Sequence, residues 1–332
     1  PLASRILLAI QSIMEKKQLT IGWYMSAKKV VQLKWRDFIA YAEQLGHTLV
    51  ELDLSKDYSM MPTIPQFDVI LLKMTDELVK VSMDEETARM VANARKLVAL
   101  CPDAALVDSL DAQALTIDRE SMHQFFERIN ALPEEMKLKC PRGLSLMSSE
   151  EKNKIPSDFQ FPAMVKSLVA SGSLSAHDMA VVWSVKDIDQ FTYPLYVQEY
   201  INHDGTIFKI YVLGEHNFTV TRVSLPNFAP EYQAPVKFNS QDWKHELPPE
   251  LTKDYTGKRQ EPSREVIAGA SKSVSELLGL SLFGFDVIEN VDTGRLAIID
   301  VNYFPDYRGV SDIFGKLLAH LMTKYNQHTA SL

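Results

Sequence analysis

The sequence predicts a mixed α/β (α+β) fold, in which a small parallel α/β domain precedes a longer region of mainly antiparallel strands. Two observations predict it. Between residues 19 and 108, apolar strand-like runs alternate with helix-like segments, and the run FDVILLK (67–73) has the continuous apolar character of a parallel strand covered on both faces. From residue 161 on, strand-like runs follow one another across short polar turns, which indicates antiparallel pairing.

The first 110 residues are expected to contain the parallel domain. Strands are expected at 19–25, 47–54, 67–73 and 104–108, and helices at 26–46, ending at Gly46, and at 84–100. Residues 1–18 include the run ILLAI, which is too short to span a membrane and has no small-residue cleavage site after it. We therefore expect an N-terminal arm or helix there, rather than a signal peptide.

The rest of the chain is expected to form two further subdomains, at 111–200 and 201–328, after the α/β domain at 19–110. A helix at 118–130 leads into strands at 161–166, 179–183, 193–200, 206–214 and 217–225. The polar stretch 226–261 is expected to be a loop. Beyond it we expect a helix at 263–279 with Ser263 as N-cap and Gly279 as C-cap, strands at 280–289 and 295–302, and a final helix through 311–325.

The bulk composition restricts the class of protein. A length of 332 residues exceeds what one hydrophobic core usually spans, so two or three subdomains are expected. The net charge of −8 argues against general nucleic-acid or membrane-surface binding, although it allows a local basic pocket. Cys101 and Cys140 do not suggest a disulfide framework, so a reducing compartment, the cytoplasm, is expected. Nothing resembles an oligomerisation element, so we expect a monomer.

The final hairpin carries the strongest chemical signal. Asp286 closes one apolar run, and Asp300 and Asn302 close the next. Side chains two residues apart in a strand point to the same side, so Asp300 and Asn302 share a face. Each residue alone is more simply a turn cap or a solvated strand end, and Asp292 in the turn keeps that interpretation. The three together offer oxygen ligands to one space, which suits Mg²⁺ shared with substrate phosphates.

Several cations lie where a phosphate would give them a partner. Lys166 ends an apolar strand and is followed by a loop of small residues, SLVASGSLSAH, which His177 closes. Lys209 and Arg222 lie inside apolar strands, where a cation needs an anion, either a phosphate or a buried carboxylate. No Walker motif GxxxxGK[ST] occurs in the chain.

Further candidates lie at strand ends. Lys28 and Lys29 follow the first strand and Lys73 the third, at the carboxyl ends where ligands bind in open α/β sheets, although lysines there are usually just exposed. The segment 198–201 runs from an apolar strand into a polar turn. Such a hinge can offer backbone N–H and C=O groups to the edge of an adenine base.

These segments together resemble the inositol 1,3,4-trisphosphate 5/6-kinase family, also called inositol-tetrakisphosphate 1-kinases, which has the ATP-grasp fold. The matching pieces run in order from about residue 20 to about residue 325. They are GWYMSAKK, LKMTDEL, DRESM, FPAMVKSLVASGSLSAHDMAVV, VQEYINHDGTIFKIYVLGE, RVSLPN, LFGFDVI and IIDVNYFPDY. The pieces NHDGTIFKIYVLGE and HDMAVV discriminate best, because generic ATP-grasp enzymes lack them. The resemblance implies that ATP is bound between the two later subdomains.

The resemblance also implies an activity and site residues. The activity is transfer of the ATP γ-phosphoryl to a hydroxyl of an inositol tris- or tetrakisphosphate. ATP would be contacted by Arg119, Lys166, Ser224, Ser240 and the segment from Gln198 through Glu199 and Ile201 to Lys209. Two Mg²⁺ ions would be held by Asp286, Asp300 and Asn302. The inositol phosphate would be surrounded by Lys29, Lys73, His177, Lys209, Arg222 and Asn302. The residues nearest the chemistry would be Lys166, His177, Lys209 and Asp300.

This assignment agrees with the physics of phosphoryl transfer, which needs positioning and charge neutralisation rather than a protein nucleophile. Two metal ions and Lys166 would neutralise the transferring group, and a second cationic shell would hold the acceptor. His177 would either orient the attacking hydroxyl or bind a phosphate.

Three departures from the family pattern concern the acceptor. The family usually has Gly where this chain has Asp306, in an F-P-G-Y turn. Aspartate tolerates left-handed backbone, which favours survival of the turn, but its carboxylate would lie near the substrate and repel a phosphate. The family's R-P-S-L is R-V-S-L here, and the loop V-A-S-G-S lacks the acid or histidine that many members carry before the glycine.

Two other functions stay open from the sequence. An ATP-grasp ligase would join a carboxylate to an amine or a thiol, but such enzymes often ligate metal through Glu and E-x-N, where this chain has Asp286 and D-x-N. A protein that binds inositol phosphates with reduced catalysis is suggested by Asp306, although the intact metal set argues against it.

Overall fold

Two compact units make up the chain in this computed structural model, which describes residues 17–133, 138–168, 178–231, 233–240, 242–247 and 259–332. The first unit contains the described residues up to 72, residues 92–107 and residues 312–332. The second contains residues 73–91 and the described residues between 108 and 311. Nearly all of the predicted N-terminal arm lies outside the described residues. Among those described, no helix has both the length and the apolar character needed to cross a membrane.

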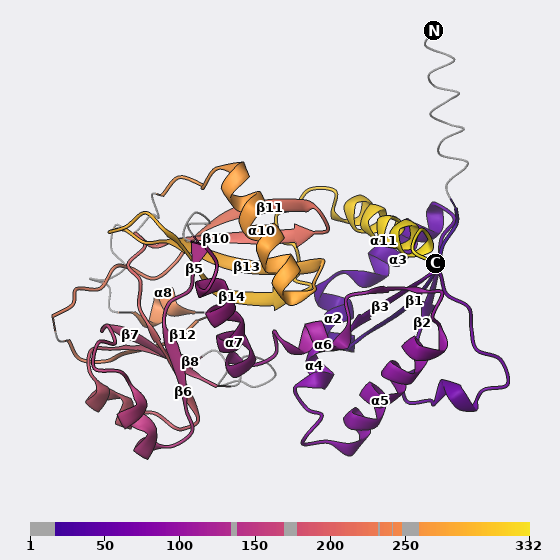
Figure 1. The fold of residues 1–332 in the computed structure, drawn as a ribbon. Helices are drawn as coiled ribbons and strands as arrows, with labels where there is room; N and C mark the ends of the chain where they lie inside the picture. The colour runs from indigo at the N-terminus through magenta and orange to yellow at the C-terminus, as the bar shows by residue number, and fades with distance from the viewer. Residues whose placement is uncertain (1–16, 134–137, 169–177, 232, 241, 248–258) are drawn as a thin grey trace, which may run out of the picture. The chain divides into compact units, whose positions relative to one another are not determined.

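The first unit is built on a four-stranded sheet of order β2-β1-β3-β4; Figure 1 labels its first three strands. Its strands are β1 (Thr20–Met25), β2 (Thr48–Glu51), β3 (Val69–Lys73) and β4 (Ala105–Val107), and the pairs β1–β2 and β3–β4 are parallel, as predicted. Its helices are α2 (Ala27–Gln32), α3 (Trp35–Gln44), most of α5 (Glu85–Leu100) and α11 (Ile313–Thr329). The helix predicted at 26–46 is two helices, because Lys34 adopts left-handed backbone with φ 51°.

The last helix belongs to the first unit, which differs from the predicted boundary at residue 328. Helix α11 contacts α3 and β4 and buries Leu317, Leu318 and Leu321. Apolar spacing identified the helix correctly but carries no information on which sheet it covers.

The second unit contains two five-stranded sheets. One has the order β12-β8-β7-β9-β6 and is antiparallel throughout. The other has the order β11-β10-β13-β14-β5 and is antiparallel except for the β14–β5 pair. The strands are β5 (Leu138–Lys139), β6 (Gly143–Leu146), β7 (Ala163–Ser167), β8 (Asp178–Val182), β9 (Leu195–Glu199), β10 (Thr206–Leu213), β11 (His216–Val223), β12 (Val236–Asn239), β13 (Leu282–Glu289) and β14 (Leu296–Tyr303).

The helices of this unit connect and cover the sheets. They are α4 (Thr75–Leu78), α6 (Leu110–Ala114), α7 (Arg119–Asn130), α8 (Trp243–Glu246) and α10 (Arg264–Leu278). Helix α7 contacts β6 of one sheet and β5 and β14 of the other (Figure 1). Helix α10 begins and ends as predicted: the Ser263 hydroxyl accepts a hydrogen bond from the Val266 amide, and Gly279 adopts φ 68°. The prediction of a loop over 226–261 is wrong for β12 and α8.

Strand alternation decides which side chains reach the space between the sheets. In β7, Ala163 and Val165 belong to one apolar cluster, whereas Met164 belongs to another on the opposite face. Lys166 shares the face of Met164 because side chains alternate along a strand. The period of two therefore brings a lysine into the interior of the unit without interrupting the first cluster.

A buried aspartate fixes the start of β13. Asp108, just after β4, has φ 60°, and its carboxylate accepts hydrogen bonds of 2.8 Å from the Ser281 amide, the Ser281 hydroxyl and the Leu282 amide. Charge-assisted bonds to buried backbone amides are among the stronger polar contacts. Asp108 therefore ties residues far apart in sequence to the strand that carries Asp286.

Replacing Asp108 should destabilise the protein. We expect Asp108→Ala to lower the free energy of unfolding by about 2–4 kcal/mol, because two buried amides and a hydroxyl lose their acceptor, and Asp108→Asn to lower it by less. Denaturant unfolding measures the change. Asp103→Ala, at an exposed position before β4, is the matched control and should change the stability little. An Asp108→Ala protein as stable as the control would contradict this role.

Candidate active site

A cavity of about 530 Å³ lies in the second unit, lined by residues of both five-stranded sheets and of α7. The antiparallel sheet supplies Lys166 from β7 and Gln198 from β9. The other sheet supplies Lys209, Asp286 and Asp300. The lining therefore brings together most of the charged residues that the sequence singled out.

A one-residue irregularity in the β13–β14 ladder aligns the acids. Val287 pairs with Ile298, yet the preceding residue, Asp286, pairs with Asp300, so Ile299 is left over as a bulge. Residues directly opposite in a ladder point to the same face, so the bulge gives Asp286 and Asp300 a common face. A regular register would have paired Asp286 with Ile299 and turned Asp300 to the other face.

The acid set is completed by an amide. Asn302, two residues beyond Asp300, also lines the cavity, and its amide nitrogen donates a 2.6 Å hydrogen bond to the Asp300 carboxylate. The predicted grouping of the three side chains is thus present. Asp286 does not close its apolar run, because β13 continues past it to Glu289, and β14 continues one residue past Asn302 to Tyr303. Alternation lets a polar side chain face a cavity while the strand continues.

A partly buried ion pair balances part of this charge. The Lys209 ammonium lies 2.8 and 2.7 Å from the two carboxylate oxygens of Asp286. Burial raises the pKa of Asp286, with Asp300 adding to the effect and Lys209 opposing it. Burial is the largest influence on the pKa of Lys209 and acts to lower it, but the charge and hydrogen bonds of Asp286 and the charges of Asp300 and Tyr211 together outweigh burial, and the pKa is raised. Lys209 therefore has the buried carboxylate that was one of its two expected partners.

Lys166 lies on the opposite wall of the cavity, where a neutral amide rather than a carboxylate accepts its hydrogen bond. Its ammonium donates a 2.8 Å hydrogen bond to Oε1 of Gln198. Burial lowers the pKa of Lys166 to about 8, the positive charge of Arg119 lowers it further, and Asp300 and Asp286 act against this. Arg119, at the start of α7, also lines the cavity and donates to the carbonyl of Ser167. Two neighbouring buried cations form a site suited to an anion.

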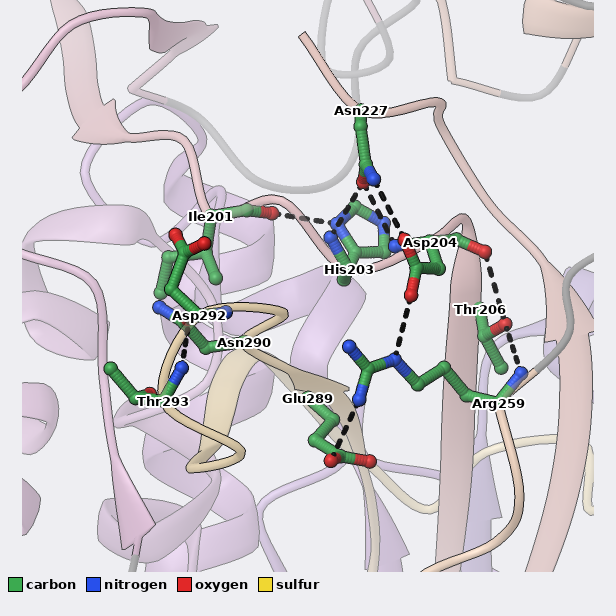
Figure 2. A network of polar contacts seen from close by, with 10 residues as sticks. All are labelled: Ile201, His203, Asp204, Thr206, Asn227, Arg259, Glu289, Asn290, Asp292 and Thr293. Carbon is green, nitrogen blue, oxygen red and sulfur yellow. Dashed lines mark hydrogen bonds and ion pairs between the residues drawn. The ribbon is translucent and has the colours of Figure 1, made fainter. Parts of the chain in front are cut away.

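The hinge after β9 is held by polar contacts, which Figure 2 shows. Buried His203 bonds the Ile201 carbonyl through Nδ1 and the Ser224 hydroxyl through Nε2, at 2.7 and 3.1 Å. The side-chain oxygen of Asn227 accepts from the amides of His203 and Asp204. Ser224 lines the cavity, so this network orients a predicted nucleotide contact.

A second part of the network ties the hinge to β13. The Arg259 guanidinium forms ion pairs with Asp204 and Glu289 at 3.0 and 2.8 Å (Figure 2). Its backbone amide donates to the Thr206 hydroxyl at 3.3 Å. Arg259 therefore joins the strand that carries Asp286 to the turn that follows β9.

The cavity gathers some predicted residues and leaves others aside. Among the residues predicted to contact ATP, metal or acceptor, it is lined by Arg119, Lys166, Gln198, Lys209, Arg222, Ser224, Ser240, Asp286, Asp300 and Asn302. Glu199 and Ile201 do not line it. Glu199 alternates with Gln198, and its carboxylate pairs with Arg142 at 2.6 Å while its amide donates to the Arg142 carbonyl. His177 lies outside the described residues.

Lys29 and Lys73, the lysines predicted to contact the acceptor, are not among the residues that line this cavity. Lys29 is on α2 in the first unit, where it donates to the side chain of Gln32. Lys73 is buried, and its ammonium donates to the backbone carbonyl of Tyr303 at 2.8 Å. Lys73 therefore holds the end of β14, one residue beyond Asn302.

Sequence reasoning missed the apolar wall of the cavity. Met164, Met179, Leu225, Phe238 and Trp243 line it next to the polar groups. Met164 could have been found, because it alternates with Lys166 on β7. Phe238 and Trp243 could not, because they lie on β12 and α8 inside the predicted loop.

The described residues contain no group of three or more His, Cys, Asp or Glu arranged to hold a metal ion. The acid set of this cavity has two carboxylates and one amide oxygen. Mg²⁺ usually keeps several water molecules and is bound through one or two carboxylates together with substrate phosphates. A small donor set is therefore what a shared Mg²⁺ site requires.

Comparison with known proteins agrees with this geometry. The ATP-grasp domain model of the inositol 1,3,4-trisphosphate 5/6-kinases matches residues 126–323, and their pre-ATP-grasp domain model matches residues 20–113. The chain belongs to this kinase family. An inositol-tetrakisphosphate 1-kinase of Danio rerio is 31% identical over 318 residues, covering 91% of this chain and 78% of that protein. One of Xenopus laevis is 31% identical over 313 residues, with the same shares covered.

The fold of this family member is ATP-grasp. The solved structure of the ATP-grasp ligase PsnB with a minimal precursor superimposes with a TM-score of 0.59, covering 92% of this chain and 99% of that one. The sequence identity is 15%, so the likeness concerns the fold alone. The predicted fold class, a parallel N-terminal sheet followed by two mixed or antiparallel sheets, is confirmed.

The lowered pKa of Lys166 makes a pH dependence testable in this kinase. Below pH 8 the ammonium is charged, and above it the ligand-free protein loses the charge. A bound phosphate favours the charged form, so we expect ATP affinity to fall by up to about tenfold per pH unit as the pH rises above about 8. Titration with a fluorescent ATP analogue between about pH 7 and about pH 9.5 measures this.

A matched variant separates Lys166 from other titrating groups. Lys166→Arg keeps its charge over this range, so its affinity should change less with pH than that of the unmodified protein. Equal pH profiles for the two proteins would show that Lys166 is not the group responsible.

Proposed function

We propose that the chain is a Mg²⁺-dependent kinase that transfers the γ-phosphoryl of ATP to a hydroxyl of an inositol tris- or tetrakisphosphate. Membership of this family shows that the chain is a kinase. The observation that carries the proposal is the cavity itself, in which the Asp286, Asp300 and Asn302 set faces the same space as Lys166 and Arg119. One wall suits a cation and the other suits phosphates.

ATP fits the polar and apolar lining. A lysine ammonium can only donate, so the bond from Lys166 fixes the Gln198 amide with its oxygen toward the lysine and its nitrogen as a donor. This nitrogen is buried and has no hydrogen-bond partner among the residues the structure describes. An acceptor nitrogen of a purine would satisfy it. Phe238 and Trp243 supply apolar surface for a base.

The acid set fits Mg²⁺ by its chemistry. Carboxylate and amide oxygens from Asp286, Asp300 and Asn302 are hard ligands on one face of a sheet. Bound Mg²⁺ would supply charge neutralisation at the phosphates. We propose two ions, on the family resemblance.

The protein residues would position the reactants. Lys166 and Arg119 would hold phosphates of the donor, and Lys209 and Arg222, on the same face as the acid set, would hold those of the acceptor. No serine, cysteine or histidine nucleophile is needed, because in-line transfer between two bound substrates depends on orientation and charge stabilisation. Lys29 and His177 stay predicted acceptor contacts. Lys73, through the Tyr303 carbonyl, would set the position of Asn302.

The carboxylate ligase is not the function we propose. Similarity to ATP-grasp ligases at 15% identity supports the fold and nothing more. The family match and the cationic residues around the acid set support a polyphosphate acceptor. A monomer in the cytoplasm is the setting we propose, and the free thiols of Cys101 and Cys140 are consistent with a reducing compartment.

Radiolabel transfer from ATP to a panel of inositol phosphates tests the activity. The unmodified protein should label at least one inositol tris- or tetrakisphosphate in the presence of Mg²⁺. Asp300→Asn should lower kcat by about 10²-fold or more, because a ligand charge is lost where phosphoryl charge develops.

Asp292→Asn is the matched control on the same hairpin. Asp292 lies in the exposed turn between β13 and β14, with its amide bonded to Asn290 (Figure 2), and its variant should keep kcat within about twofold. ATP binding without transfer to any inositol phosphate would sink the proposed function. Equal losses in both variants would sink the role of Asp300.

A further inference from the structure

The turn after β14 folds back along the sheet face that carries the acid set. Gly284 stands opposite both Asn302 and Tyr211 in the ladders, so it lies on the cavity face. A Cβ atom at Gly284 would meet Pro305 of the turn at 3.1 Å. Further along, the Tyr307 hydroxyl donates to the Val212 carbonyl at 2.9 Å. The turn therefore packs on the sheet next to the end of the cavity that Asn302 lines.

Left-handed backbone makes this return possible, but not at the expected residue. Phe304, Tyr307 and Gly309 have φ values of 41°, 47° and 93°. Asp306 itself is not left-handed, so its tolerance of that conformation is not what preserves the turn. The backbone at position 306 therefore places no left-handed requirement on the side chain there.

The acid in this turn has a cationic partner. The Asp306 carboxylate accepts from the Arg308 backbone amide at 3.2 Å, and its other oxygen lies 3.2 Å from the Arg308 guanidinium. The Arg308 side chain is 75% exposed and that of Asp306 22%. The expected repulsion of a phosphate by Asp306 is therefore offset by an arginine two residues on.

Tyr211 connects this ion pair to the cavity. Its ring lies 5.5 Å from that of Tyr307, and its hydroxyl lies 3.4 Å from the guanidinium of Arg222, which lines the cavity. Burial raises the pKa of Tyr211, and the charges of Arg222 and Asp306 act on it in opposite directions. Asp306 and Arg222 are therefore both close to one phenol at the acceptor end.

The Asp306–Arg308 pair is weak enough to open. An exposed ion pair contributes little stability, because water screens it and two side chains must be held still. A phosphate dianion offers an arginine fork a stronger, bidentate contact. An acceptor phosphate at the turn would therefore compete successfully for Arg308.

We propose that Arg308 binds a phosphate of the inositol polyphosphate acceptor, and that Asp306 limits this binding by holding Arg308 and repelling the same phosphate. The inference rests on the proposed function and adds specificity to it. Asp306 and Arg308 would act as a unit, in which Arg308 attracts the phosphate and Asp306 weakens that attraction. An acceptor without a phosphate at this position would be affected by neither residue.

Steady-state kinetics on four variants tests this proposal. We expect Arg308→Gln to raise the acceptor KM on the order of tenfold for the best inositol phosphate, with the ATP KM and kcat within about twofold. The acceptor KM of Arg308→Lys should lie between those of the unmodified protein and Arg308→Gln, because lysine keeps the positive charge but cannot make the bidentate contact of a guanidinium. Asp306→Asn should lower the acceptor KM, and the double variant should fall between the two single ones.

Controls separate this role from general effects. Arg264→Gln removes an exposed arginine from the first turn of α10 and should leave the acceptor KM unchanged. Thermal unfolding should give equal Tm values for all variants, because the pair is exposed. Loss of affinity for acceptor and ATP together would contradict the proposal, as would an unchanged acceptor KM in Arg308→Gln or a raised one in Asp306→Asn.

Direct binding keeps the test independent of turnover. Calorimetric titration with an inositol tetrakisphosphate, without ATP, should give weaker binding to Arg308→Gln than to the unmodified protein. An unmodified protein that binds but transfers nothing would contradict the proposed function and leave this comparison valid. Equal affinities in the two proteins, or no binding to either, would overturn the role of Arg308.

Discussion

The extra residue in the β13–β14 ladder is the constraint on which the site depends. By leaving Ile299 unpaired, it sets Asp300 directly opposite Asp286 and keeps Asn302 on the same face. Two carboxylates then share one space, and burial, with the charge of Asp300 adding to it, raises the pKa of Asp286. The cations around the cavity follow from the cost of this burial, because the fold must supply positive charge or leave a buried charge uncompensated.

The positive charge is divided between two walls. Lys209 pairs directly with Asp286, whereas Lys166 donates to the amide oxygen of Gln198 and has its pKa lowered to about 8 by burial. Lys209 therefore compensates Asp286 in the ligand-free protein, whereas the charge of Lys166 would be stabilised by an anion that binds beside it. This difference is the electrostatic basis for placing the donor phosphates near Lys166 and Arg119.

Much of the fold could be predicted because its signals are local. The caps of α10 at Ser263 and Gly279 depend on a few neighbouring residues, and they were predicted correctly. The continuous apolar run of β3 and the ordered motifs of the kinase family could also be recognised from the sequence. Strand β12 and helix α8 were missed, because a short strand between polar turns has too few residues to show a period.

Partners of charged side chains were the least predictable part of the site. Lys209 was expected to meet either a phosphate or a buried carboxylate, and the ladder between β10 and β13 gives it Asp286. Lys73 was expected at an acceptor, and the fold gives its ammonium the Tyr303 carbonyl, 230 residues away in sequence, as a partner. Such contacts depend on chain crossings that no local pattern contains.

Residues 296–310 show which features the sequence determines by itself and which depend on the tertiary structure. The sequence by itself determined that Asp300 and Asn302 share a face, since alternation is a property of a single strand's backbone. It also determined that an acid stands at Asp306 in the turn. Only the tertiary structure decided that this face is also that of Asp286, and that the turn, with Asp306 and Arg308, returns to the same sheet beside Gly284. Register and turn placement arise from hydrogen bonds and packing between segments far apart in sequence, which the order of residues within one segment does not specify.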